Sequence, residues 1–197
     1  KPMTSSLGWS RESFGFAIAL QNLVWGLSQP FAGALADRWG AYKVIVAAAV
    51  VYAFGLYVMS FAQTPVDLSL SAGVLIGLAL SGTSFPIVLA VVGRSAPPER
   101  RTLLLGIAAT GGSAGQLAMV PLSQSLITGL GVAEALIALS ALALVMVPLG
   151  LGLGGGTARS QALTDAPSQS IGGVLGEAAR HKGFWLLTGG FFVCGFQ

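Results

Sequence analysis

The sequence contains one pattern that is typical of a covalent nucleophile. Residues 111–115 read Gly-Gly-Ser-Ala-Gly and fit G-x-S-x-G, the pattern that presents a serine, here Ser113, in serine hydrolases. A serine nucleophile needs a base within hydrogen-bond reach. The one histidine, His181, lies outside the long apolar runs, and no strand pattern precedes Ser113. We therefore interpret the pattern as helix packing and expect no enzyme, with an intramembrane serine hydrolase as the alternative.

Residues that bind metals, cofactors or nucleic acids are sparse. Cys194 is the one cysteine, and it has no partner at metal-ligand spacing. His181 stands between Arg180 and Lys182, which is typical of a solvated position. The net charge of +3 comes from basic residues scattered over the segments between apolar runs. We expect no metal, no cofactor and no nucleic-acid partner.

Uncharged polar side chains inside the apolar runs are the remaining candidates for binding a solute. In a membrane, such side chains favour the bundle interior or a water-filled cavity. The first run carries two polar pairs seven residues apart, on one helix face around Trp25: Gln21 with Ser28, and Asn22 with Gln29. Hydrogen bonding between helices is the alternative role. The candidates for cavity or inter-domain contact are Gln21, Asn22, Trp25, Ser81, Ser84, Ser113 and Gln116.

The composition indicates a membrane protein. Of 197 residues, 54% are hydrophobic and 9% are charged, and the mean hydropathy is +0.79, so the charge cannot cover a soluble protein. A helix crosses a hydrocarbon core about 30 Å thick with about 20 residues. Because the runs are apolar on both parities, transmembrane strands are excluded. We predict an all-α polytopic transmembrane helix bundle with spans at about 14–36, 44–62, 68–92, 103–127 and 134–153.

The basic residues predict the orientation of this bundle. Lysine and arginine gather in the cytoplasmic loops of membrane proteins. Eight of the ten basic residues fall on one set of alternate loops, and Lys1 and Arg11 fall on the other set. We therefore expect the loops 37–43, 94–101 and 154–183 in the cytoplasm, and the N-terminus outside.

The chain divides into three parts by composition. Residues 1–153 are predicted as an N-terminal transmembrane helical domain. Residues 154–183 open with three glycines and are rich in polar residues, which predicts a cytoplasmic linker between domains. Residues 184–197 read as the start of a further membrane helix. Because Lys1 is not an initiator methionine and no signal pattern follows it, we expect one more helix upstream.

Small residues predict where helices approach each other. Gly73 and Gly77, and likewise Gly111 and Gly115, stand four residues apart, a spacing that lets helices pack closely. The second and fifth apolar runs carry few polar residues, so we expect those two helices at the periphery of the bundle.

The segment after the first apolar run carries the most specific motif. Gly33 to Lys43 read G-A-L-A-D-R-W-G-A-Y-K and resemble the signature loop of the major facilitator superfamily, G-x-L-A-D-R-x-G-x-x-K. We expect Gly33 to permit a close helix approach and Gly40 to permit a tight turn. Asp37 can accept hydrogen bonds from a helix N-terminus while it pairs with a cation. A generic positively charged turn is the alternative.

The resemblance implies a fold and a mechanism. In the superfamily, this loop joins the second and third of twelve helices and latches the two six-helix halves together on the cytoplasmic side. The chain would then be the N-terminal six-helix domain without its first helix, with the C-terminal half of the same chain missing. The resemblance implies a multi-pass membrane protein that transports its solute by alternating access. The gating role carries over to Gly33, Asp37, Arg38, Gly40 and Lys43.

A weaker likeness concerns the branch of the superfamily. Four segments are similar in texture to monocarboxylate and oxalate/formate transporters: Lys1 to Met3, Leu7 to Arg11, Gly82 to Phe85 and Gly106 to Gln116. This implies a secondary transporter, a symporter or antiporter, of a small organic anion in a bacterial inner membrane. Its partners would be the lipid bilayer, the solute, and a coupling proton or counter-anion. A membrane sensor or scaffold that does not transport is the alternative function.

One feature departs from another branch of the superfamily. Many members, especially proton-coupled drug exporters, carry an arginine inside the fourth helix, whereas no residue from Leu68 to Gly93 is charged. This puts that exporter type and its proton coupling in doubt.

Overall fold

The computed structural model describes residues 11–152, 173, 176 and 179–194. The chain forms two compact units, Lys1–Leu163 and Thr164–Gln197. Within the described residues the elements are all helical, as the all-α prediction requires. Most of the predicted linker at 154–183, and the last residues of the predicted span at 184–197, lie outside the described residues.

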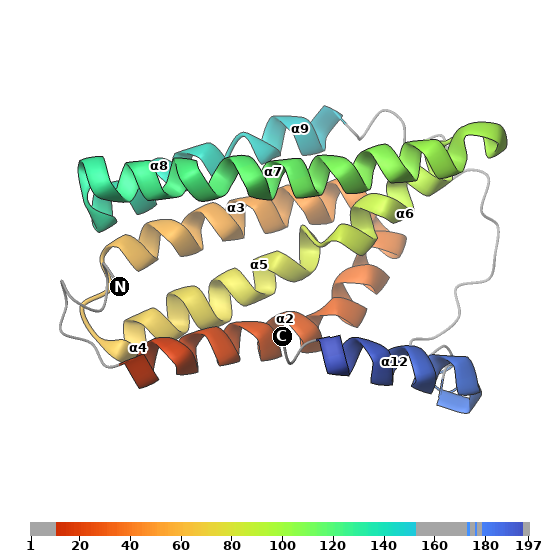
Figure 1. Cartoon of the computed structure of the whole chain (residues 1–197), viewed down its shortest axis with the longest axis horizontal. Helices are drawn as coiled ribbons and strands as arrows, with labels where there is room; N and C mark the ends of the chain where they lie inside the picture. Colours follow the sequence, from red (N-terminus) through yellow and green to blue (C-terminus); the bar gives the residue numbers. More distant parts are fainter. Residues whose placement is uncertain (1–10, 153–172, 174–175, 177–178, 195–197) are drawn as a thin grey trace. The chain divides into compact units, whose positions relative to one another are not determined.

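The first unit is a bundle of helices (Figure 1). It begins with two long helices, α2 (Arg11–Trp39) and α3 (Ala41–Ser60). The next rod combines α4 (Pro65–Leu68), the π-helix η1 (Ser69–Leu75) and α5 (Ile76–Gly82), and α6 (Phe85–Ser95) follows a short break. The 3-10 turn η2 (Pro98–Arg100) leads into α7 (Arg101–Leu130), α8 (Val132–Ala143) and α9 (Met146–Gly152).

Single glycines make two of the connections. Gly40 joins α2 to α3 with φ 96°, and Gly131 joins α7 to α8 with φ 94°. A side chain at such a φ is strained, so glycine suits both turns. The connection before α4 is closed by a capping box, in which Thr64 Oγ1 accepts from the Asp67 N–H at 3.2 Å and the Asp67 carboxylate accepts from the Thr64 N–H at 2.9 Å. These tight turns make consecutive helices neighbours.

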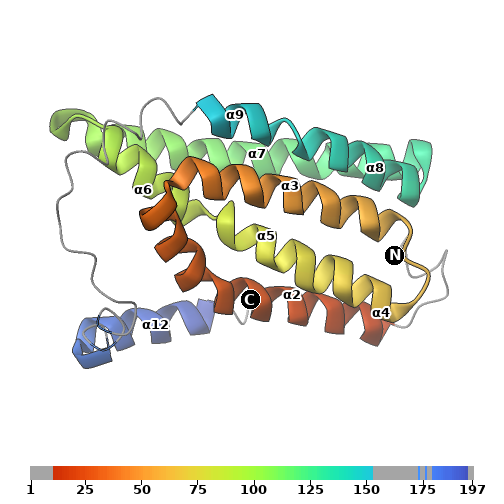
Figure 2. The ribbon, with the colours of Figure 1, turned by 180° about the vertical axis from the view of Figure 1, so that it is seen from behind.

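α3 has more buried residues than any other single helix of the described unit. Figure 2 shows it between α5 and α8, and eight of its residues are buried. The buried Ser140 hydroxyl of α8 donates to the Ala53 carbonyl of α3 at 2.7 Å. Within this unit α3 is therefore covered by its neighbours, whereas most of the stretch Val132–Gly152 is not buried, so the expectation that both helices are peripheral in the whole bundle stays a prediction. Their scarcity of polar groups and their many alanines suit close packing.

α7 is the opposite case, because none of its residues is buried. Within the described residues it packs against α6 at its start and α8 at its end. The polar residues of α7 had suggested an interior position, yet the middle of this helix, residues 110–122, is exposed in this unit apart from the approach of one ring to it. The first unit thus has one well-covered helix and one largely uncovered helix.

Four helical stretches of the described chain are long and apolar enough to cross a membrane: Ala41–Ser60, Pro65–Ser95, Pro98–Leu130 and Val132–Gly152. α2 corresponds to the first predicted span but does not meet this criterion, although it is 29 residues long. Its glutamines and asparagine lower its hydropathy. Pro30 lies inside α2, and Figure 2 shows that this helix bends along its length.

In the second unit, α12 spans Lys182–Cys194 and follows a short stretch around His181. The Trp185 indole N–H donates to the Ala179 carbonyl at 2.9 Å. The rings of Phe184 and Trp185 meet edge to face with centroids 5.8 Å apart. These contacts fix the start of an apolar helix.

Candidate functional site

The predicted motif forms a sharp helical corner between α2 and α3. Asp37 lies in the last turn of α2 and Lys43 in the first turn of α3, so Gly40 is the one non-helical residue of the stretch predicted as a loop at 37–43. The Gly40 N–H donates to the Ala36 carbonyl at 3.0 Å, and the Lys43 N–H donates to the Gly40 carbonyl at 3.2 Å. The chain reverses within one residue because Gly40 accepts a positive φ.

Asp37 connects this corner to the end of α6. The Arg94 Nη1 donates to the Asp37 Oδ1 at 3.0 Å, and 43% of the Arg94 side chain and 68% of the Asp37 side chain are exposed. Asp37 thus pairs with a cation, as the motif predicted. The partner Arg94 was not predicted, because the two residues stand 57 positions apart and no local pattern links them.

The other motif residues make fewer contacts. A Cβ at Gly33 would meet no atom within 4 Å, so the close helix approach that we expected there is not made by the described residues. Arg38 and Lys43 are exposed, and neither forms a salt bridge with another described residue. The Lys43 ammonium lies 5.8 Å from the centroid of the Tyr42 ring. The corner therefore presents two cations outward.

The third rod is interrupted where α2 contributes a polar side chain. Thr83 and Ser84 separate α5 from α6, and Ser84 has extended backbone with φ −68° and ψ 150°. The buried Ser84 hydroxyl donates to the Gln29 Oε1 of α2 at 3.5 Å. This distance is long for an O–H···O bond, so both groups keep capacity for another partner.

The break also exposes the start of a helix. α6 begins directly after Ser84, with no side chain capping its first turn and with a proline in that turn. The N-terminal end of a helix carries partial positive charge. Ser84, Gln29 and the start of α6 therefore bring polar groups and a positive dipole end together inside a candidate membrane span. The sequence places Gln29 on the polar face of α2, but Gln29 was not among the candidates for cavity contact.

The remaining polar candidates do not converge on this break. Asn22 donates to the Ile18 carbonyl at 3.0 Å, within its own helix, and the buried Ser81 donates to the Leu78 carbonyl at 2.7 Å, also within its own helix. Gln21 is partly buried and Trp25 is 36% exposed. No hydrogen bond between described side chains joins these residues to Ser84.

Ser113 presents its hydroxyl group on α7. Its side chain is exposed, and it forms no hydrogen bond with any described residue. The one histidine, His181, belongs to the other unit. Gln116, one turn further along α7, is likewise exposed. Over the described residues, no three His, Cys, Asp or Glu side chains gather in a way that would hold a metal ion.

The four predicted packing glycines fall into two classes. A Cβ at Gly73 would lie 2.9 Å from Leu20 Cδ2, and one at Gly77 would lie 2.9 Å from the Gln21 carbonyl oxygen, so this pair lies directly against α2. A Cβ at Gly111 or at Gly115 would meet no atom within 4 Å, so no described helix packs on them. Gly82 has the tightest contact, since a Cβ there would lie 2.5 Å from Ala48 Cβ, and this contact was not predicted.

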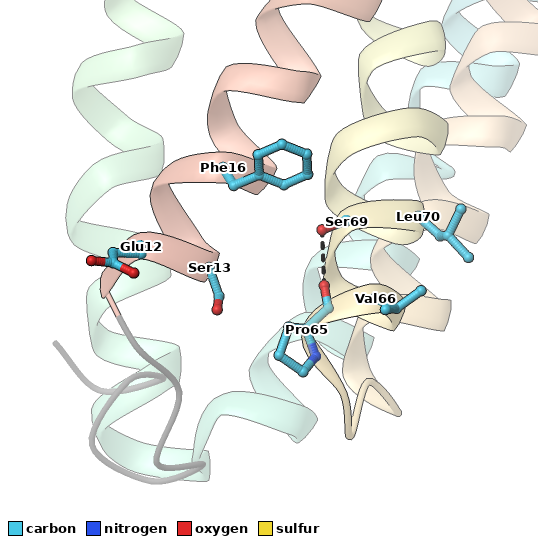
Figure 3. Close-up of a pocket in the computed structure, with 7 residues that line it drawn as sticks. All are labelled: Glu12, Ser13, Phe16, Pro65, Val66, Ser69 and Leu70. Atoms are coloured by element: carbon cyan, nitrogen blue, oxygen red, sulfur yellow. Dashed lines mark hydrogen bonds between the residues drawn. The ribbon is translucent and has the colours of Figure 1, made fainter.

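A cavity of about 490 Å³ lies at the other end of α2 (Figure 3). Its walls are mostly apolar, and the Ser69 hydroxyl on one wall donates to the Pro65 carbonyl at 2.8 Å. None of the predicted candidates lines this cavity, so it is distinct from the break at Ser84. The residues around it are Glu12, Ser13, Phe16, Pro65, Val66, Ser69 and Leu70.

Comparison with known proteins points to one family. The Major Facilitator Superfamily profile matches residues 1–197. Monocarboxylate transporter 11 of Mus musculus is 33% identical over 135 residues, which is 68% of this chain and 29% of that protein. Multidrug resistance protein MdtH of Proteus mirabilis is 38% identical over 96 residues, which is 48% of this chain and 23% of that protein.

A third relative is described as a probable anion transporter. Probable anion transporter 2, chloroplastic, of Oryza sativa is 27% identical over 144 residues, which is 72% of this chain and 26% of that protein. This chain therefore spans about a quarter to a third of the length of the three curated relatives. These likenesses support transport in general and leave the solute open.

Proposed function

The chain belongs to the major facilitator superfamily, an integral multi-pass membrane family, and on that premise we propose that the whole protein is a secondary transporter of a small organic anion such as a monocarboxylate. The similarity to a monocarboxylate transporter and to an anion transporter supports this solute class. The mechanism would be alternating access around a site near the middle of the membrane.

The observation that carries the proposal is the interrupted rod at Ser84. In secondary transporters, the N-termini of broken helices point at anionic solute groups. Here the start of α6 lies beside Ser84 and Gln29, which offer a hydroxyl and an amide to a carboxylate. Ser84 is buried at 4% exposure within this unit, so helices or side chains of the unit itself must shift for the solute to reach it.

The second part of the proposal is a gate at the motif corner. Asp37 and Arg94 hold the α2–α3 corner against the end of α6. The outward cations Arg38 and Lys43 would contact the other half of the protein when the cytoplasmic side is closed. Gly33 has open space beside it, which supports a contact with a segment outside the described residues.

The proposed topology puts this corner in the cytoplasm. Basic residues gather at the end of the bundle that holds 37–43 and 94–101. We propose that one helix precedes this chain, that residues 154–183 link two domains, and that a second half follows. Ser113, Gln116 and the open glycines of α7 would then face the cavity or that second half. The membrane would be a bacterial inner membrane.

Counterflow in vesicles tests this function. The full-length protein is reconstituted, the vesicles are loaded with an unlabelled monocarboxylate, and uptake of the labelled acid is followed over time. We expect a transient overshoot of label that an unloaded vesicle lacks. No overshoot with any small acid would contradict the proposed solute class. Uptake that depends on the loaded acid indicates a counter-anion, whereas uptake that depends on an imposed proton gradient indicates a coupling proton.

Export of drugs is the second candidate, because the match to the multidrug resistance protein has the higher identity over a shorter segment. The same vesicles, loaded with a cationic dye and energised with a proton gradient, would then lose the dye. Dye efflux without acid counterflow favours export. Absence of both activities favours a sensor or scaffold on the same fold.

A further inference from the structure

The structure gathers at one place several basic residues that stand apart in the sequence. Arg94 lies in the last turn of α6, Arg100 ends the short turn η2, and Arg101 begins α7. A Cβ at the buried Gly93 would lie 3.4 Å from Arg101 Nη2 and 3.5 Å from Arg101 Nε. The Arg101 guanidinium therefore rests against the last turn of α6, where glycine leaves room for it.

The charges of this α6–α7 junction, residues 93–101, are unbalanced. It contains three arginines and one carboxylate, Glu99. Arg94 is already paired with Asp37. Arg100 and Arg101 are exposed and form no salt bridge with any other residue that the structure describes. Two guanidinium groups thus remain available to an anion.

The surroundings of these two arginines indicate which anion. They stand at the very start of the apolar stretch Pro98–Leu130, at the depth where phospholipid headgroups meet a membrane helix. Leu103 and Ile107, on the first two turns of α7, are 63% and 59% exposed. Apolar side chains below and cations above match the tail and the headgroup of a lipid.

We propose that the α6–α7 junction binds the phosphate headgroup of an anionic phospholipid in the cytoplasmic leaflet, with Arg101 and Arg100 as its contacts. Gly93 positions the Arg101 guanidinium for this contact. An acidic segment of a protein partner would meet the same charges, but it would not cover the exposed apolar residues beside them. Arg100 and Arg101 belong neither to the break at Ser84 nor to the motif, so their contact with lipid stands or falls independently of the solute.

Native mass spectrometry of the full-length protein tests this site. The protein in detergent is titrated with phosphatidylglycerol or with zwitterionic phosphatidylcholine, and the apparent Kd of the first bound lipid is measured for each. We expect Arg101→Gln and Arg100→Gln each to weaken phosphatidylglycerol binding about fivefold and to leave phosphatidylcholine binding unchanged. Arg11→Gln, at the first residue of α2, is the matched control. It should change neither the phosphatidylglycerol Kd nor the phosphatidylcholine Kd.

Three outcomes would overturn the assignment. The first is a phosphatidylglycerol Kd in both arginine variants within about twofold of the parent, below the effect expected for one charge. The second is full displacement of the lipid by millimolar inorganic phosphate at constant ionic strength, which would assign the arginines to a soluble anion. The third is an equal loss in the Arg11→Gln control. If Arg101→Gln does not fold, the exposed Arg100→Gln decides alone.

Discussion

α3 and α7 are both apolar helices of one bundle, yet they are covered very differently. α3 buries eight residues against its neighbours, and α7 buries none. The contacts of α3 run through alanines and glycines, as at Ala48 beside Gly82. The glycines of α7 at 106, 111, 115 and 129 have open space beside them. Within this unit, residues are therefore buried where small residues of one helix meet another helix. No described helix meets these four glycines of α7.

This difference gives α7 a role that α3 does not have. Ser113 and Gln116 are polar groups in the uncovered middle of a candidate membrane span, where exposure to lipid would be costly. A segment beyond the described residues would cover them, or a water-filled cavity would solvate them. α3 forms the framework of the unit, and we propose that α7 forms a contact surface.

The largest expected effect tests the tight side of this contrast. Gly82→Leu forces a side chain into Ala48, because even a Cβ at residue 82 would lie 2.5 Å from the Ala48 Cβ. Overpacking of this kind costs about 1–3 kcal/mol or more. We expect a clearly lowered unfolding midpoint of the full-length protein in detergent, followed by tryptophan fluorescence. The matched control is Gly106→Leu on α7, and an equal loss in both would break the contrast.

The two glycine turns should behave alike although they join differently packed helices. Gly40→Ala and Gly131→Ala each place a Cβ on a backbone with φ above 90°. Such strain costs about 1–3 kcal/mol irrespective of packing. We expect both variants to lower the unfolding midpoint, and Gly26→Ala, in the open middle of α2, to leave it unchanged or higher. Normal stability of Gly40→Ala would show that the corner adopts another backbone.

A smaller effect is expected from the hydrogen bond between α3 and α8. Ser140→Ala leaves the Ala53 carbonyl without its 2.7 Å donor in a buried position. Interhelical bonds in membranes contribute about 0.6 kcal/mol on average and up to about 1.7 kcal/mol. Ser125→Ala on α7 removes only an exposed bond to the Leu122 carbonyl of the same helix. In mixed micelles, we expect Ser140→Ala to lower the free energy of unfolding more than Ser125→Ala does. Equal free energies of unfolding would contradict a buried hydrogen bond at Ser140.

The smallest effect concerns the exposed ion pair at the motif corner. Exposed pairs contribute about 0.2–1 kcal/mol, and most of the Asp37 side chain is exposed. A double-mutant cycle of Asp37→Asn and Arg94→Gln should give a coupling energy in that range for unfolding. The same variants should change the rate of counterflow by a larger factor, if the corner is a gate. A coupling of zero in both measurements would remove Arg94 from the gate.

The sequence predicted the helical fold, since long charge-free runs leave few other structures in a membrane. It also identified Asp37 and Gly40, because a motif carries them in consecutive positions. It did not identify the pairs Asp37–Arg94 and Ser84–Gln29, whose members stand 57 and 55 residues apart. No periodicity records which distant residue meets which.

The sequence also does not show which helices cover one another. Polar residues in a membrane span indicate that some polar environment surrounds them, but they do not say which segment supplies it. Among the described residues, no helix buries the polar groups of α7. The predicted span at 103–127 was shorter than α7, because Thr128 and Gly129 continue the helix and the turn comes at Gly131.

The central claim is that the break at Ser84 is part of the solute site, and counterflow kinetics test it most directly. Ser84→Ala and Gln29→Ala remove the two side chains that contact each other there. Each lost hydrogen bond to a charged carboxylate is worth about 1.5–3 kcal/mol, so we expect KM for a monocarboxylate to rise about tenfold or more with an unchanged unfolding midpoint. Parental KM in both variants would contradict the account.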